Sequence, residues 1–476
     1  MRLPRGAAGA SASDRSRSRG DRGSALIITL WVAFGLVALA LYFGDTSALD
    51  LRASDNRAAG LEADQAIEGA ARYATYLLGK LDPPGVLPAP ATYQHEAAAV
   101  GDSTFWFIGR DPKQPAQVTT DLPFFALVDE ASKLDLNTAT AAMLQLLPRM
   151  TPELAAAIVD WRDADSEVTE LGAEDETYLL KNPPYHCKNA PFESVDELRL
   201  VEGADAGILY GEDLNRNGVL DVNENDGTAS LPLDDRNGRL DPGILEFVTV
   251  AAKEPLTTTN GTPRINIRQN PGQNAQLRTL LQTALGTARG NQVMGQLGGG
   301  GAGGGQGGQG GQPVTINSVL EFYLRSRMTT DEFALVESDL YSAQGTNAPS
   351  GLVNINTAGE QVLACIPGIG TELAPTLVAY RQSNAGKRDT VAWAAELLGA
   401  QNAARAGRYI TGRSHHFSAD IAAVGHFGRG YRRARFVFDL SAGTPRIIYR
   451  QDLGDLGWAL GRPARSRLQT LAMDSR

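Results

Sequence analysis

Hydrophobic and polar positions divide the chain into a long apolar start and an alternating end. Twenty consecutive residues from Ser24 to Phe43 carry no charge. As a helix with a rise of about 1.5 Å per residue they would cross roughly 30 Å of hydrocarbon. Beyond them no proline occurs until Pro83, and the spacing predicts one long helix over 24–82 whose second half is amphipathic. Its apolar stripe comprises Ala59, Ala63, Ile67, Ala70, Ala74, Leu77 and Leu81.

Basic residues ahead of the apolar run predict its orientation in a membrane. They are Arg15, Arg17, Arg19 and Arg22. Because arginines stay on the cytoplasmic side, we expect a single pass with the N-terminus in the cytoplasm and everything after Asp45 on the far side. No small-residue cleavage site ends the apolar run, which argues against an ordinary secretory signal.

The period changes from helical to alternating near the C-terminus. Three stretches separated by glycine-containing turns, 416–425, 433–441 and 445–452, predict a small antiparallel sheet. Apolar stretches at Phe105–Ile108 and Phe124–Val128 are expected to complete it. Between these parts lies 297–312, expected to be a flexible, glycine-rich linker with almost no core-forming residue.

The middle of the chain contains an internal repeat. Two segments related by an offset of 219 residues match without a gap. We expect each copy to form a helix begun by an Asn-Thr cap, a turn at a proline and a second helix, giving hairpins over 134–163 and 353–382. The identical pairs are Asn137/Asn356, Thr138/Thr357, Ala139/Ala358, Leu144/Leu363, Pro148/Pro367, Glu153/Glu372, Leu154/Leu373, Ala155/Ala374, Val159/Val378 and Arg162/Arg381.

The second hairpin supplies the alternative function. Its turn carries Gly368 and Gly370 and matches a helix-hairpin-helix, a motif that can expose backbone N–H groups to a DNA phosphate. A membrane-anchored DNA-uptake protein is the function this favours. The first copy has neither glycine, and the flanks of the second carry few of the cations that phosphate binding requires. We therefore expect packing or protein contact, and no nucleic-acid partner.

A twelve-residue stretch has the spacing of a calcium loop, Asp-x-[Asp/Asn]-x-[Asp/Asn]-Gly followed by Glu at the twelfth place. Alternate oxygen side chains converge on one ion in such a loop, and Gly218 permits its sharp turn. Calcium is therefore the expected cofactor, in a free-standing loop that stiffens the fold. The predicted ligands are Asp213, Asn215, Asn217, Val219 through its carbonyl, Asp221 and Glu224.

A partial echo of this loop follows twenty residues later. Leu233 and Ile244 occupy its first and last places, where Asp234 or Glu246 could substitute. A solvated turn without metal is the other reading. The second, weaker site would comprise Asp235, Asn237 and Asp241.

Composition narrows the class of protein. A net charge of −10 and a pI of about 5.2 give the whole chain no attraction to nucleic acid or anionic lipid. Cys187 and Cys365 are too few for a disulfide framework, and both a single disulfide and two buried thiols stay open. No zinc spacing, phosphate loop or nucleophile elbow occurs, so we predict no enzyme. We interpret one basic run as the solvated face of an edge strand: Arg429, Arg432, Arg433 and Arg435.

The N-terminal features together resemble a type IV prepilin. The resemblance implies that a prepilin peptidase cuts after Gly23, so that the mature chain begins at Ser24, where the family usually has Phe or Met. An uncut membrane tether is the alternative. Most pilins carry Glu at the fifth mature position, which here is Ile28. Type II secretion systems build a related filament, the pseudopilus. In that family the subunit at the tip of the filament, called K-type, lacks this Glu.

Residues 160–203 resemble the signature of K-type minor pseudopilins, also called general secretion pathway protein K, of type II secretion systems. The family's calcium binding in its inserted domain makes Asp163, Asp165, Glu174 and Asp175 further candidate ligands. The matching residues are Asp160, Trp161, Asp163, Asp165, Gly172–Asp175, Tyr178, Pro183–Tyr185, Lys188, Asn189, Pro191, Phe192 and Glu197–Val201.

The resemblance implies an α+β fold, in which a long N-terminal helix packs on a small antiparallel sheet and a large, mainly α-helical domain with helix-hairpin-helix-like repeats is inserted. It implies a minor pseudopilin that caps the periplasmic pseudopilus after insertion in the inner membrane. The implied partners are the I- and J-type minor pseudopilins, the major pseudopilin, the prepilin peptidase and the inner-membrane assembly platform. The expected parts are a leader (1–23), the helix (24–82), pilin-like strands (83–130), the inserted domain (131–415, with its calcium region at 211–246) and the C-terminal sheet and tail (416–476).

Overall fold

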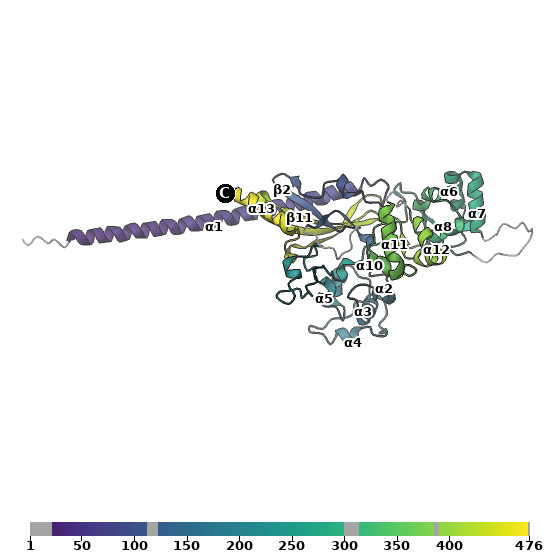
Figure 1. The fold of residues 1–476 in the computed structure, drawn as a ribbon, viewed down its shortest axis with the longest axis horizontal. Coiled ribbons are helices and arrows are strands. Elements are labelled where there is room, and N and C mark those ends of the chain that lie inside the picture. The colour runs from purple at the N-terminus through teal and green to yellow at the C-terminus, as the bar shows by residue number, and fades with distance from the viewer. Residues whose placement is uncertain (1–20, 112–121, 299–313, 385–389, 475–476) are drawn as a thin grey trace, which may run out of the picture. The chain divides into compact units, whose positions relative to one another are not determined.

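The computed structural model describes residues 21–111, 122–298, 314–384 and 390–474. The expected leader up to residue 20 and most of the glycine-rich linker lie outside these residues. The chain divides into two compact units, 1–58 and 59–476. Helix α1 (Asp21–Leu78) contributes to both (Figure 1).

The described part of the first unit consists of α1 alone. By length and composition this helix could cross a membrane, and its side chains from Leu26 to Phe43 are exposed. Gly23 and Ser24, the predicted cleavage site, lie within it. The predicted long helix is confirmed, although it ends at Leu78 and not at residue 82.

The second unit contains a seven-stranded sheet in which all neighbouring strands are antiparallel. The order is β1–β2–β11–β12–β13, with β3 beside β2 and β4 beside β11. Segments before and after the repeats thus share one sheet, as the sequence pattern predicted. The strands are β1 (Ala98–Val100), β2 (Ser103–Gly109), β3 (Phe124–Phe125), β4 (Val128–Asp129), β11 (His416–Val424), β12 (Arg432–Asp439) and β13 (Arg446–Asp452).

Helices cover both faces of this sheet. The second half of α1 packs on one face, where Phe107 and Phe436 are buried against its alanine-rich stripe. The other face carries Trp106 and Ile108, which alternate with the first set and pack on α13 (Gly461–Asp474) (Figure 1). This alternation is the two-residue period of a strand, which gives each face its own core.

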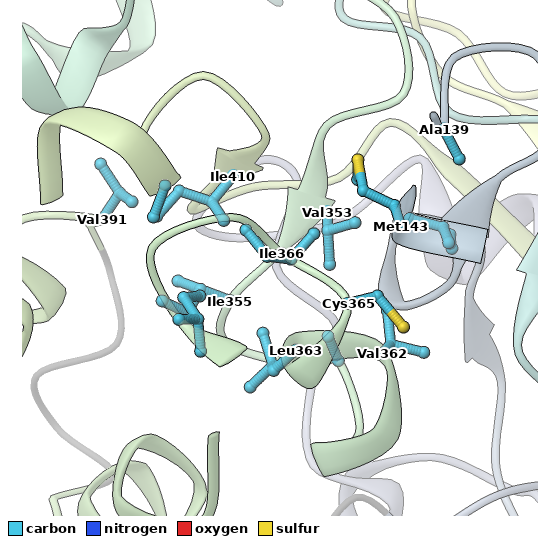
Figure 2. Close-up of a cluster of buried hydrophobic side chains, with 14 of the residues drawn as sticks. Ala139, Met143, Val353, Ile355, Val362, Leu363, Cys365, Ile366, Val391 and Ile410 are labelled. Carbon is cyan, nitrogen blue, oxygen red and sulfur yellow. The ribbon is translucent and has the colours of Figure 1, made fainter. Parts of the chain in front are cut away.

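The two predicted hairpins are present and share one core. They pair α2 (Ala141–Leu144) with α3 (Pro152–Arg162), and α10 (Glu360–Ala364) with α11 (Gly370–Ser383). Figure 2 shows Met143 of the first hairpin beside Cys365 and Val362 of the second.

The predicted Asn-Thr caps are wrong. Thr140 caps α2 and Gly359 precedes α10. Asn137 instead exchanges hydrogen bonds with the backbone of Phe192, so the segment before the helix is fixed by tertiary contacts.

A short parallel strand pair opens each hairpin, and this arrangement occurs a third time. The third copy was not predicted, because strands of two residues have no detectable period. The pairs are β5 (Leu134–Asp135) with β6 (Val248–Thr249), β9 (Val353–Asn354) with β10 (Ile410–Thr411), and β7 (Ile265–Asn266) with β8 (Leu340–Tyr341); the last is followed by the helices α6 (Ala275–Leu285) and α7 (Thr287–Leu297).

Short helices complete the inserted region. Two of them, α8 and α9, are separated near Thr329, which caps α9. The helices are α4 (Asp175–Tyr178), α5 (Ala206–Tyr210), α8 (Val319–Ser326), α9 (Thr330–Ala334) and α12 (Trp393–Ala406).

Candidate functional site

The predicted calcium loop follows α5 and ends in a single 3-10 turn, Val222–Glu224. Asp213 opens it, accepting hydrogen bonds from the backbone N–H groups of Asn217 and Gly218, both at 2.9 Å. Gly218 has φ +73°, the left-handed conformation that the motif requires of its glycine. The first half of the loop is therefore folded around one carboxylate.

The remaining predicted ligand side chains form hydrogen bonds within the same loop. The side-chain amides of Asn215 and Asn217 donate to Oδ2 of Asp221, at 2.8 and 3.2 Å. Glu224 closes the loop, accepting from the N–H groups of Leu214 (3.2 Å) and Asp221 (3.0 Å). Hydrogen bonds within the loop thus connect all five predicted ligand residues, although their three carboxylates do not already stand together as a metal cluster, and Val219 is buried.

The loop holds an excess of buried negative charge. Burial, and then the charge of Asp213, raise the pKa of Glu224 to about 8. Burial also raises the pKa of Asp213, although the guanidinium of Arg110 lies 3.5 Å from its carboxylate. Three carboxylates, two amides and one carbonyl form an all-oxygen donor set, the kind that calcium prefers. The residues present therefore fit this ion.

The loop is fastened to the sheet by an arginine that the sequence analysis misjudged. Arg433 of β12 donates to the carbonyl oxygens of Asn215 (2.5 Å) and Arg216 (3.0 Å). It is also paired with Asp420 of β11 at 2.5 Å. The interpretation of the basic run as a solvated edge is wrong for Arg433 and Arg435, because β12 lies between two strands and both side chains are buried. The inserted region covers this face.

A second arginine holds the loop from the end of β2. Arg110 donates to the carbonyl oxygen of Arg216 at 3.1 Å and is paired with Glu246 at 2.7 Å. Glu246 is consequently engaged in this ion pair, and it is not free to complete the weaker site.

The weaker loop has the same backbone turn but not the same convergence. Its Gly238 has φ +73°, as Gly218 does. Asp241, however, is paired with Arg149 at 2.8 Å, while Asp235 and Asn237 are exposed. The structure therefore does not gather these three residues as it gathers the first set. Asp234, the other suggested substitute, accepts backbone N–H groups of its own loop.

The acidic run contains buried carboxylates that lack strong donors. Glu174 is 2% exposed, and neither of its oxygens has a hydrogen-bond partner other than the weak thiol of Cys187 nearby. Oδ1 of Asp163 is likewise buried without a partner. Burial raises the pKa of both carboxyls, with Asp160 adding to each. Because unpaired buried carboxylates are costly, they indicate a place for a cation.

The outer members of the run have protein partners. Asp175 accepts from the ring of His186 at 2.9 Å and from the N–H of Cys187 at 2.7 Å. Asp165 accepts from the N–H of Glu167. In the described part of the chain, no three His, Cys, Asp or Glu side chains already stand together as a metal cluster. The predicted calcium loop would also use two asparagine side chains and a backbone carbonyl, which are not among these four residue types.

The two cysteines are free, buried thiols in the structure. The thiol of Cys365 donates to the carbonyl oxygen of Gln361 at 3.2 Å. That of Cys187 lies 3.8 Å from the carbonyl oxygen of Asp160. Of the two alternatives left open by the sequence, the structure has the unbonded one.

The glycine turn of the second hairpin faces protein on one side. A Cβ on Gly368 would lie 2.7 Å from the carbonyl oxygen of Asn402, in α12. The N–H groups of Ile369 and Gly370 donate to the carbonyl oxygen of Ile366, at 3.0 and 3.2 Å. These donors are therefore already engaged, which disfavours the phosphate cradle of a DNA-binding hairpin.

Comparison with known families finds a match for the region that contains the first hairpin and the acidic run. Residues 126–210 match the family model for protein K of the type II secretion system, in its first domain. Residues 349–389 match a helix-hairpin-helix motif model, which coincides with the second hairpin.

Curated relatives carry the same name, type II secretion system protein K. The relative from Klebsiella pneumoniae is 43% identical over 61 residues, which cover 13% of this chain and 19% of the relative. That from Pseudomonas aeruginosa is 34% identical over 115 residues, covering 23% and 33%. The match thus spans a fifth to a third of the length of these relatives.

A solved structure is also similar, a chain of the GspK–GspI–GspJ complex from enterotoxigenic Escherichia coli. It shares 13% identity with a TM-score of 0.33, over 82% of this chain and 97% of that one. The similarity to protein K is therefore carried by the sequence matches and not by this likeness.

The protein K domain ends three residues before the predicted calcium loop, so the two candidate cation sites flank its boundary. Sequence analysis missed the residues that join them to the sheet, namely Arg110 and Arg433. The two-residue period does place Arg433 on the face opposite Phe436, but it does not show whether that face is covered.

Proposed function

We propose that this chain is a K-type minor pseudopilin that caps the periplasmic pseudopilus of a type II secretion system and supports its assembly for protein export. The protein K match over 126–210 carries the proposal. A long N-terminal helix packed on an antiparallel sheet agrees with a pilin-like subunit. The role is structural, and no reaction is assigned to it.

The N-terminus supports a subunit that leaves the membrane for a filament. In this proposal a prepilin peptidase cuts between Gly23 and Ser24, and α1 then passes from the inner membrane into the pseudopilus. Ile28 stands where most pilins have Glu. A carboxylate inside hydrocarbon costs at least about 2.5 kcal/mol unless it is paired. A terminal subunit has no neighbour above it to pair with a carboxylate, so Ile28 avoids this cost.

The size of the second unit favours the tip over the shaft. Its roughly four hundred residues would clash if they were repeated along a tightly packed helical fibre, whereas an end imposes no such limit. The proposed partners are the I- and J-type minor pseudopilins, with the major pseudopilin and the inner-membrane platform engaged during assembly. The complex named in the similar structure agrees with the first two partners.

We propose calcium as a structural cofactor. Asp213, Asn215, Asn217, Asp221 and Glu224 would hold one ion, with the carbonyl of Val219. Glu174 and Asp163 would hold another within the protein K domain. When bound, calcium supplies the positive charge that these carboxylates lack. The side chains themselves order their loops through the backbone N–H groups they accept, and they exclude water by burial.

The alternative is a membrane-anchored DNA-uptake protein, which the motif match over 349–389 favours. It needs free N–H groups and cations at the turn. Gly368 is instead packed on α12, and Glu372 stands in the first turn of the following helix. A titration of the full chain with duplex DNA at low and high salt separates the two functions. Salt-sensitive binding would favour the alternative.

The decisive experiment for the pseudopilin role combines two measurements on the protein from its native membrane. Its intact mass should show that the first 23 residues are gone. The I- and J-type subunits should co-purify with it. A full-length mass, with Met1 retained, would identify a permanent tether and overturn the filament cap.

A further inference from the structure

The contacts around the calcium loop extend beyond its ligands, into the sheet. We infer that Arg433 and Arg110 are positioning residues for the cation, and that occupancy of the loop is transmitted through them to strand β12. This inference rests on the calcium proposal above. Neither arginine belongs to the calcium motif, and both lie far from it in sequence, on the two sides of the repeat region.

The two arginines donate hydrogen bonds to backbone carbonyls that lie between ligand positions. Arg433 donates to the carbonyl oxygens of Asn215 and Arg216, and Arg110 donates to that of Arg216. These carbonyls belong to the third and fourth places of the motif, directly between Asp213 and Asn217. Fixing them fixes the spacing at which the first three ligand side chains converge.

Arg216 itself has an unfavourable backbone conformation. Its φ is +55°, in the left-handed region that residues with a Cβ rarely adopt. Such a residue persists where its surroundings over-determine it. Here two guanidinium groups converge on its carbonyl oxygen. The weaker loop repeats the conformation at Arg236, with φ +56°, but Asp235 and Asn237 are exposed and Asp241 is paired with Arg149.

Each arginine carries its own counter-charge. Asp420 forms a two-bond pair with Arg433, through Nε at 2.8 Å and Nη2 at 2.5 Å. Glu246 does the same for Arg110, at 2.7 and 2.9 Å. The pairs therefore bring hydrogen-bond donors to the loop without adding net positive charge beside a cation. They hold the loop while calcium is bound.

A third contact ties the loop to the segment before α13. The side-chain amide of Asn215 donates to the carbonyl oxygen of Trp458 at 3.2 Å, in addition to its bond with Asp221. One ligand thus contacts the packing that covers the second face of the sheet. The loop meets the sheet through β2, β12 and this segment, so ordering it should order them.

Linkage makes this testable in both directions, because a coupling that lets calcium stabilise β12 must let β12 stabilise calcium binding by the same factor. The experiment uses the full chain in detergent micelles, titrated with calcium while hydrogen exchange is followed separately in the peptides covering 213–224 and 432–439. The loop peptide reports its own ion, independently of any bound at the acidic run.

Two variants and a control decide the outcome. Arg433→Lys keeps the charge but loses the forked contact to two carbonyls. Arg110→Gln removes the other guanidinium that binds the carbonyl oxygen of Arg216. We expect each to raise the calcium concentration at half-protection of the loop by about tenfold, within the usual range of coupling. Calcium should then no longer slow exchange in β12. Arg446→Gln, at an exposed position of strand β13, should change neither value.

The outcomes are distinguishable. Unchanged half-protection and retained calcium protection of β12 in Arg433→Lys would overturn the inference while leaving the calcium site intact. No calcium response in the unsubstituted loop would remove the calcium proposal, and this inference with it. The pseudopilin role would still be decided by the mass measurement. If Arg433→Lys does not fold, the half-exposed Arg110→Gln decides alone.

Discussion

Arg381 donates a hydrogen bond of 2.9 Å to the carbonyl oxygen of Ile355, the residue that follows strand β9. Arg162 makes the equivalent bond to Leu136 after β5. Each arginine lies in the last turn of its hairpin and connects that turn to the strand that opens the hairpin. This contact explains why the arginine is identical in the two copies of the repeat.

Replacing Arg381 with Met should therefore loosen the whole second hairpin. Its side chain is buried, at 2% exposure, so the substitution leaves a buried carbonyl without its charged donor. We expect a loss of about 2–4 kcal/mol in the free energy of unfolding, measured by urea denaturation. Arg278→Met, on the exposed side of α6, is the matched control and should change it by less than about 0.5 kcal/mol. Equal effects would contradict the closing role.

The repeat shows how far the sequence could predict the inserted region. Ten identities revealed two hairpins and their ends, because helices of this length carry a period. The third copy, opened by Ile265–Asn266, escaped notice since its shared Leu/Val/Ile–Asp/Asn–Leu/Ile pattern is only three residues long. Such short strand pairs are defined by partners more than fifty residues away, which no local pattern reveals.

The candidate site, like the repeat, could be predicted from the sequence only where the signal is local. Ligand spacing singled out the five candidate ligand side chains of the loop, since a motif of twelve residues is a local signal. It could not predict that Asp241 pairs with Arg149, because that choice is made by tertiary packing. The burial of Arg433 likewise depends on the inserted region covering β12, and sequence alternation alone does not show this.

Asp129 should make stability depend on pH. Its four hydrogen-bond donors are all uncharged, and burial raises its pKa from the usual 3.8 to about 6. The folded state therefore holds the proton more tightly than the unfolded state. The resulting stabilisation is fully present below about pH 4 and is lost as pH rises through 6, on the order of 3 kcal/mol.

The test for Asp129 is the difference in unfolding free energy between the wild type and Asp129→Asn, measured by urea denaturation from pH 4 to 7. The wild type should lose stability relative to the variant across this range. Asp135, whose pKa burial also raises to about 6, cancels in the difference. A difference independent of pH would show that Asp129 does not titrate in this window.

Two glycines in the second hairpin should respond unequally to alanine. Gly368 has φ +91° and no room, because a Cβ would meet the carbonyl oxygen of Asn402 at 2.7 Å. Gly370 has φ +63° and nothing within 4 Å. We expect Gly368→Ala to cost about 3 kcal/mol in thermal or urea unfolding and Gly370→Ala about 1 kcal/mol. Similar costs would indicate that α12 does not pack on this turn.

Glu174 offers a test in which the sign of the effect depends on calcium. In the presence of a chelator, Glu174→Gln removes a buried carboxylate that has no strong donor, so the variant should be as stable as the wild type or up to about 1 kcal/mol more stable. With calcium at a hundred times its dissociation constant, a bound ion adds about 2.7 kcal/mol to the wild type. The variant should lack that gain and become the less stable of the two. The calcium loop contributes equally to both proteins and cancels, while Glu170→Gln, an exposed neighbour, should follow the wild type in both conditions. A variant that is less stable with and without calcium would mean that Glu174 serves packing alone.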